Sequence, residues 1–243
     1  MNEPAKAPAF NLELVPLDRG TLQSHAYKQL REALMSGRFP PGQAITVRAA
    51  AHALGTSPMP VRGALHRLEA EGALSMRDQR RTLMIPELTQ PQLSELCDLR
   101  VLLEGLAAER AATSITDEEI GRVAEQCATL RAAAEAGDVQ AYTNANWGFH
   151  TTIYDASRMP RLLEIVESFW LRIGPYVNLM LPDRESLVAS VPNHEEALDA
   201  LRRRDGAAAR AAINSDITEC AAGLAQRIGG TSPAPAPVSR MVK

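Results

Sequence analysis

The chain has 243 residues, of which 45% are hydrophobic, 23% charged and only 4% aromatic. This is the composition of a globular protein with one large or two modest domains, and the many alanines favour helix over sheet. No apolar run approaches the ~20 residues that cross a bilayer, the first residues lack the regions of a signal peptide, and the three cysteines form no CxxC pair. We therefore expect a cytoplasmic protein with neither a membrane span nor a disulfide framework.

The net charge of −3 is unevenly distributed along the chain. Residues 18–86 hold ten Lys or Arg and five Asp or Glu, a net charge of +5, whereas residues 87–243 have a net charge of −7. Such asymmetry suggests a basic module that binds a polyanion, joined to a module with another role. An excess of basic residues of this size also occurs in domains that bind no nucleic acid. The charge alone therefore does not predict nucleic-acid binding, and sequence motifs are needed as well.

Residues 1–17 hold three prolines and little periodicity, which predicts a flexible arm. Leucines and alanines at helical spacing then predict a helix that Gly37 ends, followed by a loop, RFPPGQAI. Thr46 can cap a short helix that ends at Gly55, and Ser57-Pro58 is a favoured start for a second helix. The short runs ALSM and TLMI, separated by RDQRR, predict a two-stranded hairpin with a basic tip.

Two short helices and a basic hairpin predict a winged helix-turn-helix over residues 18–86. In this fold the start of the second helix enters the major groove of DNA, while the hairpin reaches phosphates or the adjacent minor groove. The candidate DNA-binding residues are Arg48, Ser57, Met59, Arg62, Arg67, Arg77, Arg80 and Arg81.

Beyond Pro86 the pattern is helical throughout, with capping boxes at Thr89/Gln92 and Thr116/Glu119. Further helices are expected at about 139–156, 160–181, 187–203 and 206–227. The fold class is therefore mostly α: an N-terminal winged helix-turn-helix with a small β-hairpin wing, and a C-terminal all-α antiparallel bundle over residues 87–228. The Gly/Pro/Ser-rich residues 229–243 predict a disordered tail.

Four polar residues of the helical module form a candidate metal site. Asn146 and His150 lie one turn apart on one predicted helix, while His194 and Asp216 fall on two later helices. Imidazole nitrogens with carboxylate or amide oxygens suit a divalent ion such as Zn²⁺ or Ni²⁺. The alternative is that the histidines hydrogen-bond each other, Asp216 or a ligand in a polar cavity without an ion.

Arg100 lies on a mostly apolar helix face and is a candidate clamp for a carboxylate. The competing interpretation is an ion pair with Glu104, at i+4 on the same helix. Arg172, Tyr176 and Asn178 are further candidate residues of an effector pocket.

The segments YKQLREALMSGRFPPGQAI and LGTSPMPVRGALHRLEAEGAL resemble the GntR family of bacterial transcription regulators. That family usually has arginine where this chain has Pro58 and glutamate where it has Gly63. The resemblance implies a homodimer that binds a palindromic operator in double-stranded DNA.

Residues 90–225 resemble the FCD effector domain of the fatty-acid-regulator-like branch of that family. The matching segments are LRVLLEGLAAERAA, NWGFHTTIYDAS, NHEEALDAL and ARAAINSDI. Metal-binding members have Asp, His, His and His at the positions of Asn146, His150, His194 and Asp216. The resemblance therefore implies a metal site with altered ligands, and an Arg100 that faces the ligand cavity.

The leading hypothesis is a DNA-binding regulator whose operator affinity changes when a small carboxylate metabolite binds the helical domain, with a metal ion as a candidate cofactor. A second hypothesis is a helical-bundle metal-dependent hydrolase that carries a DNA-tethering module. A third is an architectural or interaction protein without a ligand. Against the hydrolase, the sequence places no further glutamate or histidine as a general base.

Overall fold

The computed structural model describes residues 22–77, 82–180 and 183–230. The predicted arm at 1–17, Arg80, Arg81 and the tail from residue 231 lie outside these ranges. The N-terminal domain contains α1 (Leu22–Met35), β1 (Ala44–Ile45), α2 (Val47–Ala53), α3 (Pro58–Ala70), β2 (Ser75–Arg77) and β3 (Thr82–Met84).

The two short helices form for the reasons that the sequence indicates. The hydroxyl of Thr46 accepts a 3.1 Å hydrogen bond from the Ala49 amide at the start of α2. Gly55 then turns the chain in a left-handed conformation, with φ of +60°. Pro58 occupies the first position of α3, and this helix buries one apolar face, made of Val61, Ala64, Leu65 and Leu68.

The wing is a three-stranded antiparallel sheet with strand order β1-β3-β2. Ala44 pairs with Met84, and Ile45 pairs with Leu83, which also faces Met76 of β2. The predicted hairpin of β2 and β3 is therefore present, but the end of the predicted loop forms β1 and adds a third strand to the sheet. A two-residue strand is too short to show an alternating pattern in the sequence, and only its pairing with β3 defines it.

The C-terminal domain is all helical, as predicted, and consists of α4 (Gln90–Ser114), α5 (Asp117–Ala136), α6 (Val139–Ala156), α7 (Pro160–Met180), α8 (Arg184–Arg202) and α9 (Gly206–Gly230). Both predicted capping boxes are confirmed. Helix α8 begins three residues earlier than expected because Asp183 caps it, accepting a 2.8 Å hydrogen bond from the Ser186 amide. Helix α9 continues through residues 229 and 230, which were expected to begin the tail.

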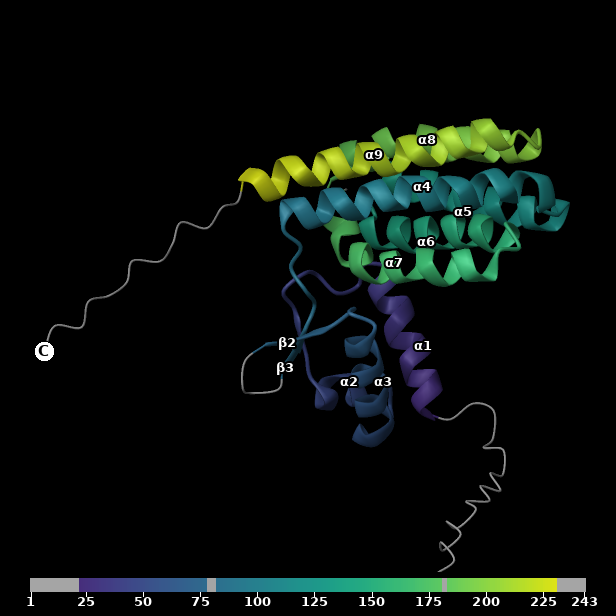
Figure 1. Cartoon of the computed structure of the whole chain (residues 1–243). Coiled ribbons are helices and arrows are strands. Elements are labelled where there is room, and N and C mark those ends of the chain that lie inside the picture. Colours follow the sequence, from purple (N-terminus) through teal and green to yellow (C-terminus); the bar gives the residue numbers. More distant parts are fainter. Residues whose placement is uncertain (1–21, 78–81, 181–182, 231–243) are drawn as a thin grey trace, which may run out of the picture.

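The bundle packs α4 against α9 and α5 against α6, with α8 beside both α5 and α9. Figure 1 shows α8 and α9 along one side of the bundle and α6 and α7 on the side that faces the N-terminal domain. Helix α1 meets α7 there and runs alongside α3. In the described residues, no helix is long and apolar enough to cross a membrane.

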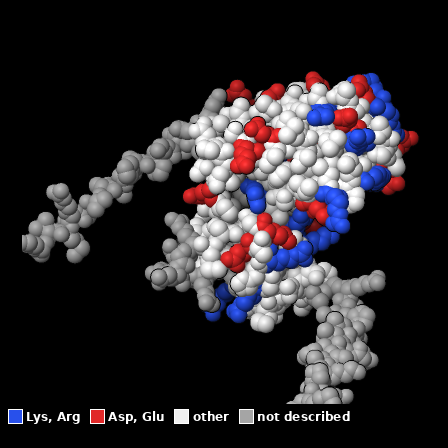
Figure 2. Space-filling model, in the orientation of Figure 1, with Lys and Arg blue, Asp and Glu red and all other residues white. Residues whose placement is uncertain are grey.

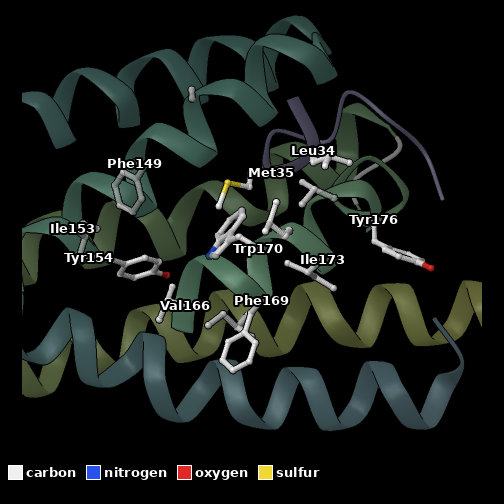
Figure 3. Packing of buried hydrophobic residues seen from close by; sticks show 14 of the residues in the cluster. Leu34, Met35, Phe149, Ile153, Tyr154, Val166, Phe169, Trp170, Ile173 and Tyr176 are labelled. Atoms are coloured by element: carbon white, nitrogen blue, oxygen red, sulfur yellow. The ribbon is translucent and has the colours of Figure 1, made fainter. Parts of the chain in front are cut away.

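One hydrophobic core extends across the junction between the two domains. Leu34 and Met35, at the end of α1, are buried together with Trp170 and Ile173 of α7 (Figure 3). Gly174 permits this close approach, because a Cβ atom added there would lie 2.5 Å from the Leu34 carbonyl oxygen. Helix α7 is therefore packed against the DNA-binding domain on one side and against the bundle on the other.

Candidate functional site

The exposed side of α3 lies opposite its buried face and presents Met59, Arg62 and His66, which we call the recognition face. Met59 is 72% exposed, more than any other large apolar side chain among the described residues. Ser57 stands at the cap position but makes no capping hydrogen bond through its side chain. Pro60, three residues later, has no N–H to donate to it. The Ser57 hydroxyl therefore remains available at the exposed start of the helix.

The other predicted DNA-binding arginines differ in position. Arg48 is exposed on α2. Arg67, in contrast, stacks on the ring of Tyr27 at 3.8 Å and pairs with Glu71 at 3.0 Å. The Tyr27 hydroxyl donates to the same carboxylate at 2.8 Å, so Arg67 helps to hold α1 against α3. Arg77 belongs to β2, but its side chain lies outside the described residues, as do Arg80 and Arg81.

Surface charge is mixed on the face drawn in Figure 2. Lys and Arg atoms of the N-terminal domain lie next to Asp and Glu atoms there, and basic and acidic atoms are also interspersed at the far end of the bundle. On this face, the basic atoms of the described residues therefore form no continuous field.

All four predicted metal-site residues come together inside the bundle. His150 and Asn146 lie on α6, His194 on α8 and Asp216 on α9, and all four are buried. One potential ligand atom from each of His150, His194 and Asp216 lies within 4.8 Å of the other two. The shortest contacts are 2.8 Å from His194 Nε2 to Asn146 Oδ1 and 3.3 Å from His150 Nε2 to Asp216 Oδ2.

Neighbouring groups orient both imidazole rings. The Nδ1 atom of His194 lies 3.0 Å from the Ser190 carbonyl oxygen, which can only accept a hydrogen bond. The Nδ1 atom of His150 lies 3.0 Å from the Tyr154 hydroxyl, whose own proton is donated to Glu104. In the neutral rings each Nδ1 therefore carries the proton, which leaves a lone pair on Nε2 of His150 beside Asp216 and on Nε2 of His194 beside Asn146.

The resulting arrangement suits a cation. Two Nε2 lone pairs face oxygen atoms of Asn146 and Asp216, and the buried Oδ1 atom of Asp216 has no hydrogen-bond partner. Burial lowers the pKa of His194, which favours its neutral form. Burial alone would raise the pKa of Asp216, but His194 and His150 hold it below the ordinary value. A neutral imidazole and an ionised carboxylate are the forms that bind metals.

Beside this centre, Arg100 is paired with Glu104, and both side chains are buried. The Nε atom of Arg100 donates to Glu104 Oε1 at 2.6 Å, and Nη2 donates to Oε2 at 3.3 Å. Although burial opposes the charge, Glu104 raises the pKa of Arg100. The i+4 pair considered as the alternative is thus formed, but it is buried in the cavity wall and not exposed.

Glu104 also accepts hydrogen bonds from Tyr154 at 2.6 Å and from the indole nitrogen of Trp170 at 3.2 Å. This carboxylate therefore joins α4, α6 and α7, and connects Arg100 to His150 through Tyr154. The sequence predicted Glu104 only as an ion-pair partner of Arg100, and it did not predict Tyr154 as a member of the site. Their spacing contained the only indication, since Glu104 is at i+4 from Arg100 and Tyr154 is at i+4 from His150.

A small cavity of about 20 Å³ lies between these groups, close to the room that one water molecule needs. It can hold an ion, but a metabolite enters only if the wall moves. The cavity is lined by Arg100, Tyr142, Asn146, His150, Trp170, Val177, Asp216, Ile217 and Cys220.

The structure places Arg172, Tyr176 and Asn178 at the junction between the domains and not in this cavity. The Tyr176 hydroxyl donates to the Pro86 carbonyl at 3.2 Å and accepts a hydrogen bond from the Leu88 amide. Asn178 donates to the Gly37 carbonyl at 2.8 Å. Arg172 lies beside Gly72, just after α3. Trp170 and Val177 lie on a different side of α7 from these residues. Sequence periodicity does not predict which side of α7 packs against the bundle and which packs against the DNA-binding domain.

A winged helix-turn-helix with an exposed recognition helix, joined to a helical domain, is the architecture of a DNA-binding transcription regulator. The chain belongs to the gntR family of bacterial regulatory proteins, whose sequence profile matches residues 22–84, and the FCD domain profile matches residues 95–219. This regulator family is the class that the sequence predicted.

Known proteins similar to this chain are regulators as well. The HTH-type transcriptional regulator McbR of Escherichia coli (strain K12) is 32% identical over 178 residues, which cover 72% of this chain and 80% of that protein. The "Probable D-xylose utilization operon transcriptional repressor" of Paenarthrobacter nicotinovorans is 28% identical over 90% of this chain and 95% of its own length. The solved structure of E. coli McbR/YncC has a TM-score of 0.80 and 29% identity, covering 86% of this chain and 99% of that one. These relatives identify a transcription regulator and not an enzyme.

Proposed function

We propose that this regulator binds a palindromic operator as a homodimer, with the start of α3 in the major groove of each half-site. The observation that carries this proposal is the exposed recognition face in a domain of the gntR family. Arg62 contacts a base edge or a phosphate, while Arg48 contacts the backbone. Met59 suits the methyl group of a thymine, and the free Ser57 hydroxyl suits a phosphate or base edge. The arginines of the wing, Arg77, Arg80 and Arg81, contact the adjacent minor groove or phosphates.

A second copy of the chain is the partner that two-fold operator symmetry requires. Two large apolar side chains on α4, Leu99 and Leu102, and one on α7, Ile165, are 40%, 56% and 46% exposed. Since α4 packs directly against α7, these three side chains offer an apolar surface for contact with the second chain.

We assign the protein to the cytoplasm, where the operator DNA is. Repression is the mode that the name of the Paenarthrobacter relative supports.

A divalent ion, Zn²⁺ or Ni²⁺, fits the buried centre. Asn146, His150, His194 and Asp216 would hold it, because their nitrogen and oxygen atoms lie close together and the buried Oδ1 atom of Asp216 has no hydrogen-bond partner. The contacts of 2.8 and 3.3 Å between facing donor atoms are close to the separation of about 3.0–3.4 Å between neighbouring ligands of such an ion. Bound there, the ion supplies positive charge and an open coordination position.

The charges of the cavity favour a small carboxylate as the effector once the ion is present. Glu104 neutralises Arg100, so the carboxylate of Asp216 adds a negative charge to the centre that opposes an anion in a buried cavity. A bound divalent ion would reverse this sign. Glu104 holds Arg100 in the cavity wall, and a carboxylate effector would lie beside its guanidinium group.

Helix α7 provides the connection between the effector and DNA. Trp170 and Val177 line the small cavity, so entry of a ligand displaces this helix. The same helix contacts the DNA-binding domain through the Arg31–Glu167 ion pair at 2.8 Å and through Asn178. A ligand that prefers one position of α7 therefore changes the placement of the two recognition helices, and with it the operator affinity.

The test begins with selection of bound fragments from random DNA, followed by affinity measurements with and without added Zn²⁺, Ni²⁺ and a panel of sugar acids, hydroxy acids and dicarboxylates. A regulator of this kind selects a palindrome, binds two chains to each, and changes its affinity with one acid only when metal is present. Steady turnover of an acid would instead favour the hydrolase. A non-palindromic consensus would contradict the dimer.

A further inference from the structure

The recognition face of α3 has a gap at Gly63. This glycine lies one turn after Met59 and one turn before Arg67, and it directly follows Arg62. In the docking mode proposed above, the first turns of α3 face the base edges, so a longer side chain at this position would lie beside them. Gly63 itself has no side chain that could reach DNA.

The side chain of Gln23, from the first turn of α1, occupies this gap. A Cβ atom added to Gly63 would lie 2.5 Å from Gln23 Cδ, 2.6 Å from Nε2 and 2.8 Å from Oε1. All three of these neighbours belong to the amide group, so the amide stands where the side chain of residue 63 would begin. Gln23 is exposed, and within the described residues no hydrogen bond engages its amide.

The helix that carries Gln23 is fixed against α3. Gln23 and Tyr27 are one turn apart on α1, just as Gly63 and Arg67 are one turn apart on α3. The first pair faces the second, because Tyr27 carries the stacked guanidinium of Arg67 at 3.8 Å. Figure 1 shows α1 running alongside α3. Gln23 is thereby held on a rigid element beside the recognition face.

A carboxamide is well suited to contact a base. It offers a donor and an acceptor in one plane, and glutamine pairs in this way with N6 and N7 of adenine in the major groove. We propose that Gln23 contacts an adenine in each operator half-site from the position that Gly63 leaves open. Gln23 is thus a specificity-determining residue that lies outside the helix-turn-helix. This inference rests on the mode of DNA binding proposed above.

The test compares base preferences of variants on the selected operator. Gln23→Ala is expected to lose about tenfold in discrimination at one position of each half-site, with unchanged binding to non-specific DNA. Gly63→Ala adds a Cβ atom that displaces the amide, so it is expected to lose the same preference. It should nevertheless raise the melting temperature, because alanine is the better helix former. The double variant should show no further loss.

Gln29→Ala provides the matched control, since Gln29 is exposed on the same helix but away from Gly63. The inference is overturned if Gln23→Ala keeps the parent's base preference, or if only Gly63→Ala changes it. The second result would assign the effect to the added methyl group. If the parent protein selects no palindrome, the proposed DNA-binding mode itself is contradicted. If the parent selects a palindrome and Gln23→Ala keeps its base preference, only the inference about Gln23 is contradicted.

Discussion

The indole nitrogen of Trp170 donates a 3.2 Å hydrogen bond to the carboxylate of Glu104, which joins α7 to α4 inside the bundle. One turn further along α7, Gly174 lies directly against the end of α1. The polar centre of the bundle and the junction with the DNA-binding domain are therefore separated by a single helical turn.

Arg62→Ala is expected to weaken operator binding by roughly ten- to a hundredfold, because the variant loses a contact to a base edge or phosphate. Fluorescence anisotropy with a labelled operator measures the affinity, and circular dichroism checks that the helices remain. Arg161→Ala removes an exposed arginine that pairs with its helix neighbour Glu164, and it should bind as the parent does. Equal affinities of the parent and Arg62→Ala would contradict the placement of α3 in the groove.

The double substitution His150→Ala/His194→Ala is expected to abolish bound metal, since it removes both nitrogen ligands of the buried centre. Elemental analysis of purified protein gives the metal content per chain. His66→Ala, an exposed histidine on α3, is the control and should retain it. If parent and double variant hold equal metal, or if the parent takes up none from a solution of Zn²⁺ or Ni²⁺, the metal site is refuted.

Gly174→Ala is expected to destabilise the protein by about 1–3 kcal/mol, since its Cβ atom would meet the backbone of α1 at 2.5–2.7 Å and force the helices apart. Urea unfolding measures the change. Gly121→Ala is a matched control in α5, where an added Cβ has no neighbour within 4 Å. It should instead stabilise the protein by up to about 1 kcal/mol. Similar effects of the two substitutions would show that the close approach of α7 and α1 contributes nothing.

Glu104→Gln is expected to cost about 3 kcal/mol in the free energy of unfolding, because it leaves the buried Arg100 without its negative partner. The loss should appear as a lower midpoint in urea. Glu118→Gln breaks an exposed pair with Arg122 on the surface of α5, and should change stability by less than about 0.5 kcal/mol. A stable Glu104→Gln protein would mean that the cavity tolerates a free guanidinium, and that Glu104 is not needed to hold it.

Glu119→Gln tests the capping box of α5 through pH. The Thr116 amide, together with Arg158 at 2.8 Å, holds the pKa of Glu119 below its ordinary value even though burial opposes this. The carboxylate of Glu119 therefore adds stability above its unfolded pKa of about 4.3, and this contribution is lost as the pH falls through the lower folded pKa.

Urea unfolding at neutral pH and near pH 3 should reveal this dependence. The parent is expected to be more stable than Glu119→Gln by about 1 kcal/mol at neutral pH, with the difference shrinking in acid. A difference that does not depend on pH would show that Glu119 acts through packing alone.

Most of the fold could be predicted from the sequence because it depends on local rules. Capping residues such as Thr116, glycine and proline stops and the period of apolar residues place nearly every helix, and the charge division separates the two domains. The short strand β1 could not be predicted, since two residues acquire strand character only by pairing with β3. The four residues of the candidate metal site could be named because their types and the family resemblance agree, although their proximity depends on the packing of α6, α8 and α9.

What the tertiary structure alone decided is which groups meet. Arg172, Tyr176 and Asn178 share a helix with Trp170 and resemble pocket residues by type, yet they hold the junction between the domains. Glu104 became part of the site only when Tyr154 and Trp170 were brought to its carboxylate, and Gln23 only when α1 packed beside Gly63. The sequence by itself determined the helices, the division into domains and the family, because these follow from patterns within each segment. A contact between helices depends on how their faces turn toward one another, and no single segment contains that information.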